Sequence, residues 1–386
     1  MAAHFLQALG YSSMIMLPLY LDHLDASRSE VGTIMAMSAL GGLALRPAVG
    51  WALDAVGRKT TLMAGTALLC VAMGLVWFVD DLGVLIYIDR ILLGISIGAL
   101  LTGYFTMAAD IVPESRRTEG LALFGISGLL PLALNPFYTT IGIEADDLRW
   151  FYPLVGVAIF VSLFFIWLIP EPASVKRHKK MSLRLVIGQL LQPRLLPVWW
   201  ATVIFAALVS CFMAFSTISA QSRGIESSTS IWLTYTCGAI SVRLFGARLP
   251  DMVGTSNMVA PALGVYGAAM LLAAVADSTA LFMAAGALAG FGHGYCFPVL
   301  TSQVVSRAED AVRGTALATF TGFWDAAALA LTPLFGMVSD LAGDRVMFSL
   351  IAVCTVIALA LWAVGEHRVS RGARASIHRR TDPSHG

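Results

Sequence analysis

Long apolar runs separated by short polar turns dominate the pattern of this chain. A helix that crosses a membrane needs about 20 mostly apolar residues, at about 1.5 Å of rise per residue. Because most turns between the runs are short, consecutive runs are expected to lie antiparallel. The pattern therefore predicts an all-α membrane protein. Twelve runs have the required length: 2–21, 31–53, 60–79, 83–109, 118–141, 150–170, 196–219, 229–249, 258–276, 280–304, 314–338 and 346–365.

The composition supports a bilayer rather than water as the solvent. Hydrophobic residues make up 58% of the chain and charged residues only 13%, whereas soluble domains carry about 25% charged residues. The five cysteines all lie in apolar runs, without CxxC or Cys/His spacing. They predict neither disulfides nor a metal site, and we expect no cofactor.

The longest polar stretch, residues 171–195, is basic and splits the runs six and six. It predicts two six-helix bundles, 1–170 and 196–365, joined by this linker and followed by a basic tail, 366–386. Placing the linker in the cytoplasm puts 18 of the 25 Lys and Arg residues on that side and four on the other. The positive-inside rule then places both termini in the cytoplasm, in a cell (inner) membrane. A disordered tail is favoured over a specific lipid site.

The two halves of the chain carry the same landmarks. Asp54 and Asp251 are 197 residues apart, and each follows an arginine by eight positions, Arg46 and Arg243. The patterns "GISIG" (94–98) and "GFGHG" (290–294) align at an offset of 196 and allow close helix approach. Six helices are therefore duplicated in parallel, so the bundles are pseudo-symmetric and a binding site is expected between them near the midplane.

The segment "GWALDAVGRKTTL" lies between the second and third runs. It resembles motif A of the major facilitator superfamily through five residues, although Ala52 replaces the usual Leu. "RILLG" (90–94) resembles motif B, with Leu93 in place of its polar residue, and 125–136 only loosely resembles the antiporter motif C. The matching motif A residues are Gly50, Asp54, Gly57, Arg58 and Lys59.

The resemblance implies a fold of twelve helices and a cytoplasmic gate. In the family this cluster clamps the cytoplasmic ends of the halves, and Arg46 and Arg58 are the local candidates to hold Asp54. The glycines are expected to allow a tight turn and close helix packing. The second copy, Asp251 with Arg243, has no equivalent of the basic pair Arg58 and Lys59, and we expect it to keep a packing role. The positive-inside rule alone explains Arg58 and Lys59 but not Asp54.

Charges inside spanning helices mark candidate functional sites. Asp325 and His293 lie near the middles of their runs, and burial favours a neutral carboxyl, so Asp325 is the leading candidate to bind a proton. Arg90 is expected to face the cavity, while its neighbour Asp89 is expected to point elsewhere, toward the headgroups. His293 is equally compatible with a hydrogen-bonded core position. Two interpretations, lining of the cavity and packing between helices, are both open for Gln7, Tyr11, Asn135 and Trp324.

These features predict a secondary transporter rather than an enzyme, since the chain has no GxxxxGK[ST], HExxH or GxSxG pattern. Proton-coupled export of a small organic solute is the first hypothesis, and proton-coupled uptake of a metabolite is the alternative. A membrane-embedded enzyme and a non-transporting sensor are remote alternatives. We expect a small-molecule substrate, the lipid bilayer and a proton gradient as partners, with no nucleic acid, and a monomer.

Overall fold

The computed structural model describes residues 1–111, 124–170, 188, 191–225, 227–308 and 313–381. Within these ranges the chain is helical, without strands. The first half contains α1 (Ala2–Ser13), η1 (Met14–Met16), α2 (Leu17–His23), α3 (Arg28–Ala55), α4 (Arg58–Leu75), η2 (Val76–Phe78), α5 (Val84–Ile111), η4 (Leu130–Leu134), α7 (Asn135–Thr140) and α8 (Leu148–Leu168). The second half contains α10 (Leu196–Ser222), η5 (Ser228–Ser230), α11 (Ile231–Phe245), α12 (Leu249–Val253), α13 (Thr255–Val275), α14 (Thr279–Arg307), α15 (Arg313–Ala342) and α16 (Asp344–Thr381).

Each of the twelve predicted spans has a helical counterpart among the described residues. Nine helices there are long and apolar enough to cross a membrane. The other three spans are shorter or interrupted. The first is broken by η1 just before Pro18, because proline cannot donate to the preceding turn. The fifth contains η4 and α7, which begin around Pro131 and Pro136, and α11 has only 15 residues.

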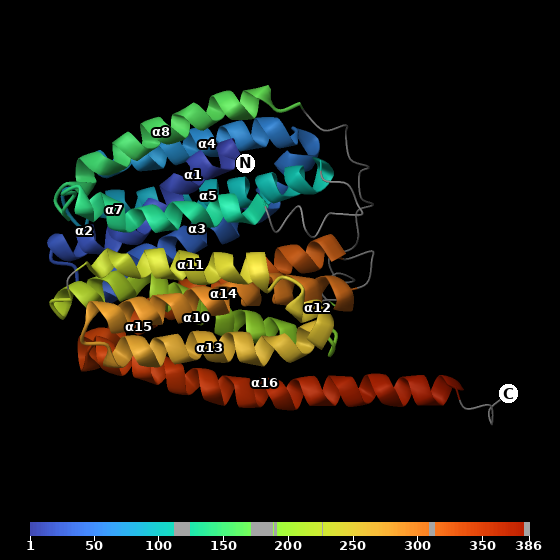
Figure 1. Ribbon diagram of the computed structural model, residues 1–386. Coiled ribbons are helices and arrows are strands. Elements are labelled where there is room, and N and C mark those ends of the chain that lie inside the picture. The colour runs from blue at the N-terminus through green and yellow to red at the C-terminus, as the bar shows by residue number, and fades with distance from the viewer. Residues whose placement is uncertain (112–123, 171–187, 189–190, 226, 309–312, 382–386) are drawn as a thin grey trace.

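The helices of the two halves form two layers. In Figure 1, α1 to α8 lie together in the upper part, and α10 to α16 lie together below them. The halves meet along a first seam, where α3 packs against α15, and along a second seam, where α11 packs against η4 and α7. In addition, α10 contacts η1, α2 and α3 of the first half. We call the end that carries α12 and the extension of α16, at the right of Figure 1, the linker face, and the other end the opposite face.

Glycine contacts confirm the internal repeat. A Cβ at Gly94 of α5 would collide with the Ser38 carbonyl of α3, and a Cβ at Gly290 of α14 would collide with the Tyr235 carbonyl of α11. Ser38 and Tyr235 are related by the 197-residue offset, and the glycines by the 196-residue offset. The same close crossing therefore occurs once in each half, as the small-residue patterns predict.

The last helix differs from the prediction. The final apolar run ends at residue 365, but α16 continues to Thr381 and extends beyond the bundle (Figure 1). The prediction of a disordered tail is therefore wrong up to that residue. Arginine and alanine are strong helix formers, and an uninterrupted backbone lets the membrane helix propagate into the basic segment.

Candidate functional site

An ion pair crosses the first seam in the linker half of the membrane. The Arg46 guanidinium of α3 donates to the Asp325 carboxylate of α15 and, at 2.6 Å, to the Thr321 hydroxyl. Both charged side chains are largely buried, with 20% and 17% of their surface exposed. Asp325 lies about 18 Å from the start of α15, at 1.5 Å per residue, so its carboxylate is within the membrane. The structure thus gives Arg46 a partner that we did not expect from the sequence, while the side chain of Asp54, the expected partner, lies outside the described part of the structure.

The same two helices are tied at the opposite face. The Asp340 carboxylate of α15 accepts hydrogen bonds of 2.8 Å from the backbone amides of Arg28 and Ser29, the first residues of α3. Ser27 and Glu30 form a capping box at the same helix end. Since the first amides of a helix have no partners within it, a carboxylate from the other half is an effective cap there.

The second seam holds Arg243. A Cβ at Gly125 would collide with the Arg243 guanidinium, so this arginine of α11 reaches across to residues 124–129 of the first half. The Tyr11 hydroxyl donates to the Gly128 carbonyl at 3.4 Å in the same region. Among the described residues Arg243 makes no ion pair, and Tyr11 lies close enough to interact with it electrostatically.

His293 is a hydrogen-bonded histidine inside the second half. Its Nδ1 lies 2.6 Å from the Tyr235 hydroxyl, and its ring packs edge-on against Phe205 and Trp324. Trp324 in turn packs edge-on against Phe205 at 4.7 Å between ring centroids. The core interpretation of His293 therefore accounts for its contacts, and Trp324 is part of the same aromatic group.

The structure corrects the interpretation of Asp89 and Arg90. Both side chains are fully buried and pair with each other, with Arg90 Nε donating to Asp89 at 2.9 Å. Their helix, α5, packs against α3 and α4 of its own half. The predictions that Asp89 is solvated and that Arg90 faces a cavity between the halves are wrong in this structure, because a buried ion needs a paired counter-charge.

Gln7 and Asn135 are buried polar residues of the first half. Asn135 Nδ2 donates to the Leu132 carbonyl at 2.9 Å, which links η4 to α7. The Gln7 and Asn135 side-chain oxygens are buried and have no hydrogen-bond partner among the described residues. The structure therefore explains Asn135 partly by local packing, whereas nothing in it explains the free Gln7 oxygen.

The motif A segment forms the turn between α3 and α4. Gly57 has a φ of 118°, which an L side chain rarely adopts, so the expected tight turn is confirmed. Gly50 has no atom within 4 Å of an added Cβ, so close packing is not its role. Arg58 is buried and donates to the Leu53 carbonyl at 2.6 Å, and Lys59 donates to the Trp167 carbonyl. The side chains of Asp54 and Asp251 lie outside the described part of the structure.

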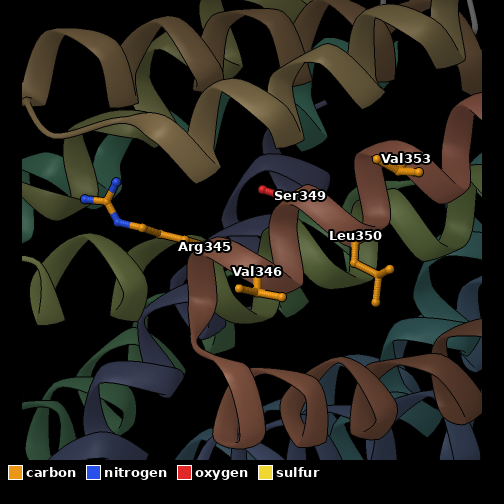
Figure 2. Close-up of a pocket in the computed structure, with 5 residues that line it drawn as sticks. All are labelled: Arg345, Val346, Ser349, Leu350 and Val353. Carbon is orange, nitrogen blue, oxygen red and sulfur yellow. The ribbon is translucent and has the colours of Figure 1, made fainter.

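A groove of about 350 Å³ lies on α16 near the opposite face (Figure 2). Its lining includes Val346, Leu350 and Val353, which are about half exposed. An exposed apolar surface on a spanning helix faces lipid, and this groove lies away from both seams. The seams, and not this groove, bring together the charged residues that point to function.

Two residues of the seams were missed in the sequence. Thr321 supports Arg46, and Asp340 caps α3. Asp340 carried a signal, because it is an acidic residue two positions beyond the end of the predicted span 314–338. Thr321 carried none, since a threonine can bond its own helix backbone anywhere along a span.

Comparisons with known proteins agree with this geometry. The family model described as Major Facilitator Superfamily matches residues 1–330 and 220–383. An MFS-type transporter of Salmonella typhimurium is 26% identical over 376 residues, which cover 93% of this chain and 94% of the relative. The nucleoside transporter NupG matches with a TM-score of 0.79 at 12% identity, covering 94% of this chain and 98% of NupG. The human organic anion transporter MFSD10 matches with a TM-score of 0.70 at 17% identity, covering 94% of this chain and 97% of MFSD10.

These matches extend over both bundles and both seams. The chain is a multi-pass membrane transporter that belongs to the major facilitator superfamily.

Proposed function

We propose that this transporter couples a proton gradient to the movement of a small organic solute by alternating access. The observation that carries the proposal is the ion pair between Arg46 and Asp325 across the first seam. The two solved neighbours are named as transporters of nucleosides and of organic anions, which supports a small organic solute.

The pair offers a direct way to couple a proton to the seam. Protonation of Asp325 removes the negative charge that holds Arg46, and in a low-dielectric seam this loss is larger than it would be in water. The seam between α3 and α15 is then weaker in the protonated state. A proton can therefore bias the equilibrium between conformations by as much as it weakens this contact.

Alternating access needs a contact on each side of the substrate. Arg46 and Asp325 lie toward the linker face, and Asp340 caps α3 at the opposite face. With the linker in the cytoplasm, the first contact and motif A close the cytoplasmic side and Asp340 closes the outer side. If the contacts on one side open while those on the other side stay closed, the space between the halves is exposed to one compartment at a time.

Export is the first proposed direction and uptake is the alternative. With a proton gradient directed inward, an exporter releases Asp325 from Arg46 when a proton enters from outside. An importer would carry solute inward together with that proton. We place the protein in the inner membrane with both termini in the cytoplasm, where 18 of the 25 basic residues then lie.

The test is transport in proteoliposomes with an imposed pH gradient, screened across organic solutes. Solute accumulation that depends on the gradient and on Asp325 is the expected result. The sign of the gradient that drives accumulation separates export from uptake. Solute movement that ignores the gradient for every transported compound would refute proton coupling.

A further inference from the structure

Arg46 and Arg243 occupy equivalent positions in the two halves. They are related by the 197-residue offset that also relates the two motif A aspartates. Each reaches across a seam to the other half: Arg46 to α15, and Arg243 to residues 124–129. The repeat therefore presents two pseudo-symmetric guanidinium groups to the interface between the halves.

The partners of these arginines differ. Arg46 bonds Thr321 and Asp325. Arg117 and Arg313, which lie at the starts of the fifth and eleventh runs, are 196 residues apart. At this offset the residue that corresponds to Thr321 is Gly125 and the residue that corresponds to Asp325 is Leu129. The structure places Arg243 against Gly125, where symmetry requires it, but the hydroxyl and the carboxylate are missing.

Arg243 is thus a half-buried cation with no ion pair among the described residues. A cation within a membrane protein needs a counter-charge, and the pseudo-symmetric position shows that a carboxylate is the group that fits. Among the residues that the structure describes, the chain supplies that carboxylate at the first seam and not at the second. A diffusible carboxylate can take the position at the second seam.

Aromatic and hydroxyl groups surround this position. Tyr11, Tyr235 and His293 lie close enough to Arg243 to interact with it electrostatically. Tyr235 contacts His293, and His293 packs edge-on against Trp324. Tyr235 is fully buried, whereas Tyr11, His293 and Trp324 are partly exposed. The partly exposed rings suit a ligand that has an aromatic body beside its charged group.

We propose that Arg243 anchors the carboxylate of an aromatic organic anion, which occupies the second seam as the transported solute. The inference rests on the proposed function, since it names the substrate class of the same interface. The guanidinium and the carboxylate would form a charge-assisted pair like the one that Arg46 and Asp325 form at the first seam.

Equilibrium binding to the purified protein in detergent tests the proposal without any gradient. The probes are benzoate, 1-naphthoate and indole-3-acetate, each compared with its neutral amide. Thermal unfolding midpoints and tryptophan fluorescence report binding. We expect the carboxylates to bind the wild type and the amides to bind at least about tenfold more weakly, the ratio set by one charge-assisted pair.

Arg243→Gln should abolish the preference for carboxylate, and Arg243→Lys should keep part of it. Arg248→Gln is the matched control, because Arg248 is an exposed arginine near the same end of α11. The proposal is overturned if no carboxylate binds better than its amide, or if Arg243→Gln keeps the wild-type preference. If the wild type binds carboxylates but its transport does not respond to a pH gradient, proton coupling is refuted and this inference still stands.

A double-mutant cycle tests the missing partner without any ligand. Leu129→Asp restores the carboxylate at the position that corresponds to Asp325, one helical turn from Gly125. Leu129→Asp should change the unfolding midpoint more favourably when Arg243 is present than in the Arg243→Gln background. The Leu129→Asp variant should also no longer bind benzoate. Leu129→Asn is the uncharged control. Equal effects of Leu129→Asp in both backgrounds would show that this position does not hold an anion beside Arg243.

Discussion

Asp325 and Arg46 lie 279 residues apart in the chain and form an ion pair between the two halves of the transporter. Neither residue has a comparable partner in its own half among the described contacts, because Arg46 bonds only Asp325 and Thr321 of α15. A single carboxyl group therefore decides whether this seam is held by charge toward the linker face.

Asp325→Asn keeps the shape of the protonated side chain and removes its titration. We expect this variant to exchange solute in counterflow at near wild-type levels but to lose uphill transport driven by a pH gradient. Both assays use the same vesicles, so insertion is controlled internally. Asp277→Asn is the matched control, because Asp277 forms an exposed ion pair with Arg345. Wild-type uphill transport by Asp325→Asn would remove Asp325 as the coupling site.

Asp54→Asn tests the motif A gate. The protein should fold and insert, but transport should fall strongly because the conformation closed at the linker face loses a charged contact. Spin-label distances across the linker face report the change once the exposed Cys237 and Cys354 have been replaced. Unchanged distances together with unchanged transport would contradict the gating role.

Asp340→Asn tests the cap at the opposite face. An amide accepts hydrogen bonds from the α3 amides more weakly than a carboxylate, and loss of a cap costs about 0.5–2 kcal/mol. We expect a cysteine at Thr33 to react faster with an impermeant maleimide added from the opposite face. Asp147→Asn is the control, since Asp147 accepts only from Glu144 and Trp150 of its own half. Equal labelling in both variants would show that the cap does not close this face.

Arg90→Leu tests the buried pair in α5. It leaves the Asp89 carboxylate buried without its cation, and breaking such a pair costs about 3–5 kcal/mol. The thermal unfolding midpoint in detergent should fall sharply. The double variant Asp89→Asn with Arg90→Leu should recover much of that loss, because no uncompensated charge remains. If the double variant is as unstable as the single one, packing rather than charge explains the pair.

Gly94→Val tests the close crossing of α5 and α3. A side chain at Gly94 collides with the Ser38 carbonyl, and overpacking a tight contact costs about 1–3 kcal/mol. We expect a lower unfolding midpoint. Gly50→Val is the control, because an added Cβ at Gly50 meets no atom within 4 Å. A loss of stability as large in Gly50→Val as in Gly94→Val would contradict the packing argument.

The class of protein, the twelve spans and the repeat follow from the order of residues alone. Runs of about 20 apolar residues can satisfy their backbone in lipid only as helices, so length and hydropathy suffice. The glycine pairs and the turn at Gly57 were also predictable, because close approach and a positive φ each demand glycine.

Which charged side chains meet depends instead on how the helices pack. Arg46 and Asp325 lie on helices from different halves, and periodicity within one helix does not show which residue of another helix it faces. Asp89 and Arg90 point about 100° apart on an ideal helix, yet the long arginine side chain folds back to its neighbour when burial leaves no other partner. Among the described residues Arg243 has no carboxylate partner, and this is a property of the packed halves, because only their packing sets Arg243 beside Gly125 and Arg46 beside Asp325.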